Sequence, residues 1–444
     1  MLGATAPFPL LALDRQSRYF RLMPADLRDT ALPIPSNFQR AIEATTALIA
    51  ENGIKGTSLR EIGLAANVNF GNLTSFFGGK DRIVAECFRQ NAQANLQRTQ
   101  AFFAEATKLG LPAEYGCSLL WDMCETAGTR YRTETLVITE LTLAAEGNPL
   151  YEGILADWFT ERTRAFRSWG QSIGLTDAAS DALNLVTLSE SCFYLSCGRS
   201  LLYRLVALGS LAELFAICSG VRPQGHSEGL SDLAQIFFSQ GVSPPATDAG
   251  KEAVGASTRA QIVDAAADAV AEHGMDGVST RLIAQKANIS LGLVSYHFPS
   301  ITNLSLAGLN RLLERVIEEM ENPETRNPVI ERMLDERRRP VTIPRASMFA
   351  YRGMCQLALT AGRMSAQAMA GQVLRRRMGS VVIRAMDYSV TPSSSRTLAA
   401  SFGLATSALF TLLPAMTNHE RPDELEKLLQ FLTYEMLGFT SPTR

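Results

Sequence analysis

The sequence lacks the residue clusters on which catalysis and metal binding usually depend. Its seven cysteines are scattered without a Cys-x-x-Cys pair, and its four histidines do not cluster with acids or thiols. A phosphate-binding loop, a nucleophile elbow and a His-Glu-x-x-His motif are all missing. We therefore expect neither a metal site nor a cofactor nor an enzyme. We interpret the cysteines as reduced core residues, with redox sensing as the alternative.

Long apolar runs and an excess of one charge are missing as well. The net charge is −2, so no overall basic field indicates nucleic-acid binding. We see no apolar run long enough to cross a bilayer and no secretory leader, which favours a cytoplasmic protein without a membrane segment. The 444 residues, 46% of them hydrophobic, suffice for several domains with large cores.

One stretch, residues 279–298, predicts two short helices joined by a turn. Ser279 or Thr280 can cap the first helix with its hydroxyl group. Asn288 then tolerates the left-handed backbone of a turn, and Ser290 can cap the second helix. This pattern is typical of a helix-turn-helix.

The second of these helices has two distinct sides. At 100° per residue, Val294 and Phe298 fall on the inner side. The outer side combines small residues with an apolar chain and an aromatic hydroxyl group: Gly292, Leu293, Ser295 and Tyr296. Such a surface suits insertion into the major groove of DNA.

A helix is also predicted in front of this pair, over residues 259–274, with Thr258 and Gln261 as a capping box. The whole segment carries Arg-x-x-Ile…Ala-Ala…Glu-x-Gly, then Ser-x-Arg-x-Ile-Ala-x-x-Ala, then Ile-Ser-x-Gly…Tyr-His-Phe-Pro-Ser. With these motifs at this spacing, residues 259–298 resemble the N-terminal DNA-binding domain of the tetracycline-repressor (TetR) family of bacterial regulators.

The same pattern occurs a second time, earlier in the chain. A shift of 221 residues aligns residues 40–83 with residues 261–304 without a gap. Twelve residues of the first segment recur at their shifted positions: Ala44, Ala50, Glu51, Gly53, Gly56, Ser58, Arg60, Ile62, Ala66, Asn67, Gly71 and Phe77. A shared helical composition does not explain so many identities. The chain therefore resembles two TetR-like units fused head to tail.

The two copies differ in residues that the family uses on the DNA backbone. Tyr296 and His297 of the second copy match the family's phosphate-contacting pair, whereas the first copy has Ser75 and Phe76. Lys80 of the first copy matches a lysine that the family carries at the start of its fourth helix, and the second copy lacks it. The alternative that the first copy is a folded relic that does not bind DNA stays open.

The resemblance implies which residues contact DNA. In the first unit these are Ser58, Arg60, Asn69, Phe70, Gly71, Asn72, Thr74, Ser75 and Lys80. In the second unit they are Ser279, Thr280, Arg281, Ser290, Leu291, Gly292, Leu293, Ser295, Tyr296 and His297. The formal charge is +1 over residues 36–85 and −1 over residues 257–303, which argues against tight non-specific binding but not against a site-specific dimer.

The resemblance also implies an all-α protein built from two tandem units. We expect an N-terminal extension over residues 1–35, a helix-turn-helix domain over 36–85, a helical regulatory domain over 86–240, a linker over 241–256, a second helix-turn-helix domain over 257–305 and a second helical regulatory domain over 306–444. The extension is basic and rich in proline; a minor-groove arm is the alternative to a loosely packed tail.

Helical patterns predict the elements of the regulatory domains. In the first we expect helices near 81–108, 112–127, 130–145, 150–172, 177–208 and 227–240, with a loop over 220–229. In the second we expect them near 304–320, 346–362, 364–388, 394–418 and 422–437. The resemblance implies that the last two helices of each half pair into a four-helix bundle. The basic run 375–377 is interpreted as a solvated helix face rather than a second DNA site.

A small apolar or aromatic ligand is the partner that the resemblance implies for these domains. Its candidate contacts are large or soft side chains: Trp121, Cys124, Trp158, Phe193, Met348, Met354 and Met364. Flexible methionines suit an adaptable pocket, but they also fill ordinary cores.

The resemblance therefore implies a ligand-responsive transcriptional repressor that acts as a single-chain pseudo-dimer on two adjacent half-sites of a double-stranded DNA operator. A further homodimer is left open. The alternative from another class is an allosteric ligand- or protein-binding protein in which one or both helix-turn-helix units no longer bind DNA. An enzyme is the third option, and the missing catalytic residues argue against it.

Overall fold

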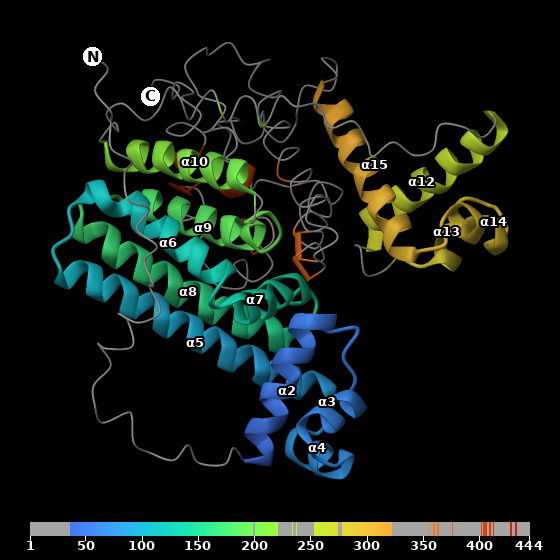
Figure 1. Cartoon of the computed structure of the whole chain (residues 1–444), viewed down its shortest axis with the longest axis horizontal. Helices are drawn as coiled ribbons and strands as arrows, with labels where there is room; N and C mark the ends of the chain where they lie inside the picture. Colours follow the sequence, from blue (N-terminus) through green and yellow to red (C-terminus); the bar gives the residue numbers. More distant parts are fainter. Residues whose placement is uncertain are drawn as a thin grey trace, which may run out of the picture.

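A computed structural model describes residues 36–198, 200–220, 253–273 and 278–321, with single helical residues at 233 and 237 and short helical runs of one to three residues between 355 and 432. The regular structure in this part of the chain is entirely helical, which confirms the all-α fold (Figure 1). The expected extension 1–35, the loop and helix over 221–240, and the expected helices after residue 321 lie outside the described residues, apart from those single positions.

Three helices form the first helix-turn-helix unit: α2 (Asn37–Asn52), α3 (Leu59–Ala66) and α4 (Phe70–Phe77). Their apolar spacing puts Ile49, Ile62 and Leu73 on the sides that face one another, and all three side chains are fully buried. The long helix α5 (Lys80–Lys108) follows directly, close to its predicted bounds.

The second unit repeats this arrangement in α12 (Ala253–His273), α13 (Thr280–Lys286), α14 (Leu291–His297) and α15 (Ile301–Glu321). Helices α13, α14 and α15 begin 221 residues after α3, α4 and α5, which is the shift of the sequence repeat. The equivalent apolar residues, Val270, Ile283 and Val294, are again fully buried. The two units therefore share one fold in one register, as predicted.

The body of the first unit is a helical bundle. It consists of α5, the short 3-10 helix η2 (Ala113–Tyr115), α6 (Gly116–Gly128), α7 (Arg132–Ala144), α8 (Pro149–Ser172), α9 (Asp177–Cys197) and α10 (Leu201–Ser219). Helix α5 packs along α8, and α9 packs on α6, α7, α8 and α10 (Figure 1). Because 18 of the 21 residues of α9 are buried, its polar side chains need partners inside the protein.

The helix predicted over residues 177–208 is in fact two helices, α9 and α10. The chain breaks near Gly198, where a Cβ atom would lie 2.3 Å from the ring of Tyr194. Ser200 then caps α10 by accepting a hydrogen bond from the N–H of Tyr203. The prediction missed this break because the apolar pattern continues on both sides of it.

Two expectations about the start of the second unit are also wrong. Helix α12 begins at Ala253, so the last four residues of the predicted linker 241–256 are helical. Thr258 therefore lies within α12 and does not cap it. The side-chain amide of Gln261 donates to the carbonyl of Ala287 at 2.8 Å, which ties α12 to the end of α13.

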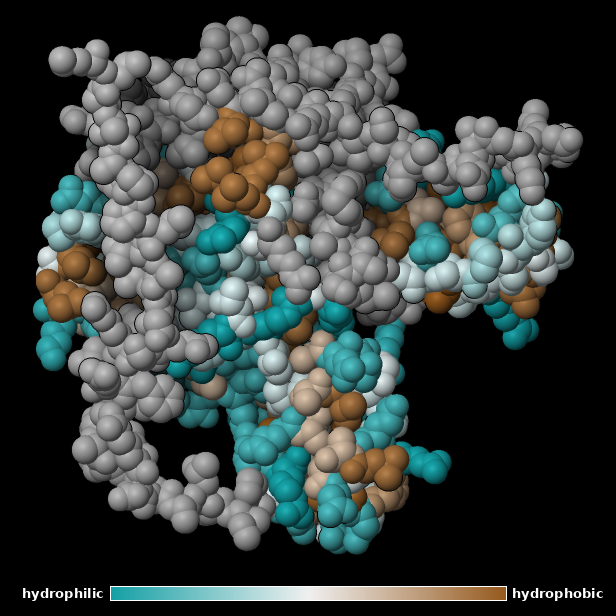
Figure 2. Space-filling view, in the orientation of Figure 1, coloured by the Kyte–Doolittle hydropathy of each residue, from teal (hydrophilic) through white to brown (hydrophobic). Residues whose placement is uncertain are grey.

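Among the described helices, α10 is long and apolar enough to cross a membrane by length and composition, which corrects the expectation that no such run exists. Half of its most apolar window is buried, and Tyr203, Val206 and Leu214 pack into the bundle. Figure 2 shows hydrophobic residues in the region of α10. A buried core helix passes the same test, so this feature alone is weak evidence of a membrane span.

Described residues from the second half of the chain bond directly to α9 and α10. The hydroxyl of Ser189 on α9 donates to the carbonyl of Leu404 at 2.8 Å. The hydroxyl of Ser401 donates to the carbonyl of Ser210 on α10 at 3.2 Å. The two halves of the chain therefore share a hydrogen-bonded interface.

A buried ion pair crosses the same interface. Arg375 is 1% exposed, and its Nη2 lies 3.2 Å from Oε2 of Glu190 on α9. The interpretation of residues 375–377 as a solvated helix face is therefore wrong for Arg375. Its charge is buried because a counter-charge from the first half is buried with it.

Replacing Glu190 by Gln should destabilise the protein strongly, because it leaves the buried guanidinium of Arg375 without a counter-charge. The expected loss is on the order of 3–5 kcal/mol, seen as a lower midpoint of chemical unfolding. The double variant Glu190→Leu/Arg375→Met should recover most of the loss, since no charge is then buried. Glu161→Gln, which breaks an exposed pair with Arg164, is the control and should cost less than about 1 kcal/mol. Equal losses in the two single variants would contradict the buried pairing.

Candidate nucleic-acid interface and ligand cavity

Asparagine forms the turn of both helix-turn-helix units. Asn67 and Asn288 each have a φ of 52°, and in the described part of the chain no other non-glycine residue has a positive φ. The short amide side chain is one of the few that tolerates this left-handed backbone. The prediction for Asn288 is confirmed, and the same turn geometry sets the path of the chain into each second helix.

Four of the predicted DNA contacts also cap helices. Ser58 forms a capping box on α3, and Asn69 caps α4. Ser279 and Ser290 accept hydrogen bonds from the third residues of α13 and α14. All four are exposed, and capping uses the oxygen as an acceptor. The O–H groups of the serines therefore remain available as donors to a phosphate.

Helix α14 exposes the side that the sequence predicts. Tyr296 is 74% exposed, and its ring meets the half-buried His297 edge to face at 5.3 Å. Leu291 and Leu293 are also exposed, while Val294 is fully buried. The remaining predicted contacts of this unit are exposed or half-buried: Thr280, Arg281, Gly292 and Ser295.

Helix α4 exposes a more apolar surface. Phe70 is 60% exposed and Phe76 is 47% exposed, and the neighbouring Leu64 on α3 is exposed as well. Figure 2 shows hydrophobic patches among hydrophilic residues over this unit. The other predicted contacts on these two helices are exposed or half-buried: Arg60, Gly71, Asn72, Thr74 and Ser75.

Glycine lies on the outer side of both second helices, and no packing contact with the described residues requires it there. A Cβ atom on Gly292 would meet nothing within 4 Å, and one on Gly71 would meet only Oδ1 of Asn69, at 3.5 Å. The missing side chain lets another molecule approach the helix backbone closely. A groove-binding helix uses such an approach.

Lys80 has a structural contact that the sequence did not predict. Its ammonium group donates a hydrogen bond to the carbonyl of Ile54 at 2.7 Å, which ties the start of α5 to the segment between α2 and α3. A lysine has three N–H donors, so two remain for a phosphate.

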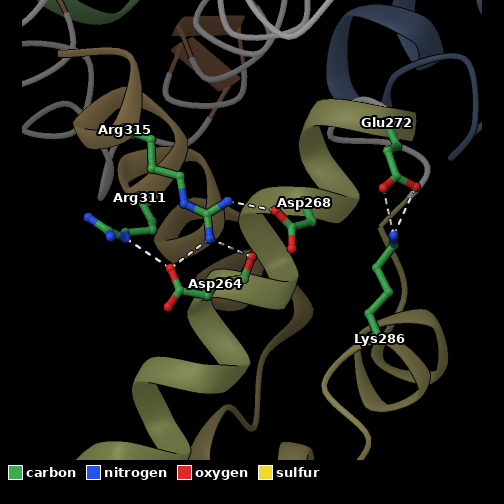
Figure 3. Close-up of polar contacts among 6 residues, drawn as sticks. All are labelled: Asp264, Asp268, Glu272, Lys286, Arg311 and Arg315. Carbon is green, nitrogen blue, oxygen red and sulfur yellow. Dashed lines mark hydrogen bonds and ion pairs between the residues drawn. The ribbon is translucent and has the colours of Figure 1, made fainter. Parts of the chain in front are cut away.

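Most basic side chains of the second unit are paired with acids (Figure 3). Lys286 on α13 lies 2.8 Å from Glu272 on α12. Arg311 and Arg315 on α15 both contact Oδ1 of Asp264, at 2.9 and 2.8 Å. Figure 3 also shows a second ion pair of Arg315, with Asp268, in which Nη1 lies 2.6 Å from Oδ1. These pairs fix α13 and α15 to α12.

The ion pairs also determine how many cationic side chains of the second unit are available to an external anion. Burial raises the pKa of Asp264, but the hydrogen bonds from Arg311 and Arg315 outweigh it, so that the pKa lies below its ordinary value. The carboxylate therefore stays ionised and holds both guanidinium groups. Among the Lys and Arg residues of α12 to α14, Arg281 is exposed, whereas Lys286 and Arg259 are half-buried and Arg259 stacks on Phe298 at 4.8 Å.

A cavity of about 170 Å³ lies inside the bundle of the first unit. Helices α5, α6, α7, α8 and α9 line it, and Cys355, Ala408 and Leu412 from the second half contribute to the lining. The walls are mainly apolar, with Phe102 and Met123 among them, but Arg162 and the Arg98–Glu134 ion pair also face it. The cavity is therefore mixed in character and shared by both halves.

The structure places only one of the described ligand candidates in this lining. Trp158 faces the cavity, and its indole N–H donates to Oδ1 of Asn95. Trp121, Cys124 and Phe193 lie outside the lining, because Cys124 and Phe193 are buried elsewhere in the core and Trp121 packs on Tyr194. The three methionine candidates, Met348, Met354 and Met364, lie outside the described residues.

Sequence reasoning missed two arginines. Arg162 lies four residues after Trp158 and four before Phe166, on the buried side of α8. A charged residue within such an apolar stripe is a sequence signal that could have identified it. Arg363 gives no such signal. Its guanidinium donates to the carbonyls of Ile49 and Ala50 at 2.9 Å.

The cysteines behave as core residues. All seven are free thiols, five of them buried. Burial raises the pKa of Cys87, Cys117 and Cys124 to about 12, so these thiols stay protonated at neutral pH. Within the described ranges, no three His, Cys, Asp or Glu residues are grouped to hold a metal ion.

Comparisons with known proteins point to the same two segments. Residues 41–87 and 262–307 each match the family model of bacterial regulatory proteins of the tetR family. The chain is similar to the HTH-type transcriptional repressor KstR of Rhodococcus jostii (strain RHA1), with 35% identity over 75 residues. This match covers 17% of the chain and 35% of the relative, so the chain spans about a third of the length of that repressor.

The asparagine turn can be tested by substitution. Asn288→Ala should lower the free energy of unfolding by about 1–2 kcal/mol, because a Cβ-bearing residue without the local amide is strained in this conformation. Asn288→Gly should retain most of the stability, because glycine adopts a positive φ without strain. Hydrogen exchange in residues 280–297 should rise in the Ala variant alone. Equal behaviour of the two variants would contradict the role of the turn.

Proposed function

We propose that this chain, which carries two tandem TetR-like units, is a DNA-binding transcriptional repressor that acts in the cytoplasm and reads two adjacent half-sites with one polypeptide. The observation that carries the proposal is the repeated helix-turn-helix, with the same turn and the same exposed outer side in α4 and α14. The matched relative is itself named a transcriptional repressor.

The contacts between the two halves support a pseudo-dimer within one chain. Helices α9 and α10 bond to Leu404 and Ser401, which lie in the predicted helix 394–418. Helix α9 and residues 394–418 are among the elements that the resemblance assigns to a four-helix bundle. A homodimer reads two half-sites about 34–36 Å apart through such a bundle. A fused pair can do so with two different recognition helices.

The two recognition helices differ, so we propose unequal half-sites. Asn72 of α4 can pair bidentately with adenine, whereas Leu293 of α14 offers only an apolar contact, for example to a thymine methyl group. The second unit retains the exposed Tyr296 hydroxyl, and the first has Ser75 in its place. We therefore propose that the second unit anchors the protein on its operator.

Arg363 offers a route from the ligand cavity to the first helix-turn-helix unit. It comes from the second half of the chain and donates to the carbonyls of Ile49 and Ala50 in the last turn of α2. The negative end of the helix dipole lies there and stabilises a cation. It also lies 2.5 Å from Glu140 on α7. The other side of α7 lines the cavity with Ile138 and Thr142. A ligand that displaces α7 would thus act on α2 and shift the population of DNA-binding states.

A protein that no longer binds DNA is the second candidate. The exposed Phe70, Phe76 and Leu64 of the first unit would suit a protein partner. The paired basic residues of the second unit weaken phosphate binding. A gel-shift assay at several salt concentrations, with DNA taken from the flanks of the protein's own gene, separates the two candidates. Salt-dependent binding to one fragment supports the repressor, and no binding to any fragment at low salt overturns it.

Two variants test which unit anchors the protein. Tyr296→Phe should weaken operator binding by about 1–2 kcal/mol, the scale of a hydrogen bond to a charged group. Lys80→Ala should reduce the slope of log affinity against log salt concentration by about one ion. If Lys80 only ties α5 to Ile54, the slope stays unchanged while the unfolding midpoint falls. Unchanged affinity in a folded Tyr296→Phe variant would show that the second unit is not the anchor.

Removing Arg363 should destabilise the end of α2 in the first unit, although the two lie in different halves of the chain. Arg363→Ala removes the side-chain donors to the carbonyls of Ile49 and Ala50 in the last turn of α2, so hydrogen exchange in residues 45–53 should become several-fold faster. Arg204→Ala, which removes a more exposed pair with Glu125 between α10 and α6, is the control and should leave this segment unchanged. Equal exchange in the wild type and the Arg363→Ala variant would remove this route of coupling.

A further inference from the structure

Arg162 is a buried cation without a buried acid. It is 4% exposed and lies in the wall of the cavity. Its Nε donates to Oδ1 of Asn184 at 2.8 Å, its Nη1 to the hydroxyl of Thr99 at 3.1 Å, and its Nη2 to the hydroxyl of Thr187 at 3.5 Å. All three acceptors are neutral. Burying a charge in this way is costly unless an opposite charge is buried with it.

The nearby acids are already paired with other arginines. The buried acids in the described part of the chain are Glu134, Asp181 and Glu190, and their respective partners are Arg98, Arg167 and Arg375. Asp122 also lines the cavity, but it is exposed rather than buried. The cavity wall therefore carries one positive charge that no acid of the described chain balances.

Burial lowers the pKa of Arg162 to about 10, so the guanidinium is still charged at neutral pH. Of its five N–H groups, three serve the neutral partners, which leaves one on each terminal nitrogen. Two N–H groups on neighbouring nitrogens match the two oxygens of a carboxylate. A single uncompensated charge also fits a monoanion better than a phosphate group with two charges.

We propose that the cavity binds an organic monocarboxylate, whose carboxylate pairs with Arg162 and whose apolar body lies against Phe102, Met123 and Ile138. The proposal rests on the ligand-responsive repressor function and narrows the small apolar or aromatic ligand expected from the sequence to an acid with an apolar body. The ligand would supply the missing counter-charge. It would also touch α7, the helix that carries Glu140 toward Arg363.

Asn184 provides a sharp test, because Asp has the same shape and would give Arg162 a counter-charge from within the chain. Asn184 is fully buried at 2.8 Å from Nε of Arg162. Asn184→Asp should raise the unfolding midpoint of the ligand-free protein and weaken carboxylate binding at least about tenfold. A merely structural role of Arg162 predicts no change in ligand binding. Arg162→Met is the second variant and should abolish the carboxylate response.

The probes are octanoate, decanoate, benzoate and phenylacetate, each compared with its primary amide and with sodium chloride at equal ionic strength. Thermal unfolding and titration calorimetry are run on the full chain without DNA. We expect at least one carboxylate to raise the midpoint by several degrees, its amide to have no such effect, and the response to be lost in Asn184→Asp.

The proposal is overturned if no carboxylate acts, if an amide or chloride acts equally, or if Asn184→Asp responds like the wild type. DNA binding is measured separately on the ligand-free protein. If the protein binds DNA in the gel-shift assay but no carboxylate raises its unfolding midpoint, only this inference is wrong. If the protein binds a carboxylate but no DNA, the proposed repressor function is wrong and the carboxylate site is supported.

Discussion

Helix α9 is buried on all sides, and each of its polar side chains must therefore find a partner inside the protein. Asp181 forms an ion pair with Arg167, Asn184 accepts a hydrogen bond from Arg162, and Glu190 forms an ion pair with Arg375. Ser189 donates across the interface to the carbonyl of Leu404. Because unsatisfied buried groups cost stability, this requirement fixes which helices surround α9. Two of its partners come from the second half of the chain, so the fold of the first half is completed by the second.

This dependence gives the fusion a physical role. A homodimer could exchange its subunits, whereas here Arg375 and Leu404 are tethered to the helix that they satisfy. The tether makes each contact intramolecular and so raises its effective concentration. It also permits asymmetry, since one half can supply a group that the other lacks. Arg363 is such a group, because it comes from the second half and caps α2 in the first.

The sequence predicted what repeats or alternates and missed what depends on distant partners. Both recognition helices, the Asn turn and the buried faces follow from local spacing, and the structure has them. The break at Gly198 was missed because the apolar pattern runs through it. Arg375 looked solvated because its neighbours in sequence are basic, while its acid, Glu190, lies 185 residues away. Of the described ligand candidates only Trp158 lines the cavity, because packing decides which large side chains face it.

Different contacts hold the two helix-turn-helix units in place, and this difference bears on how a ligand could act. In the second unit Arg311 and Arg315 bind α15 to α12 through Asp264. Shifting the two arginines by 221 residues gives Gln90 and Ala94, which cannot form these pairs. Helix α2 of the first unit instead packs on α7 and is capped by Arg363. A ligand against α7 therefore has a direct path to the first unit. In the proposed repressor, the ion-paired second unit with its exposed Tyr296 would be the anchor on the operator, and the first unit would be the one that moves.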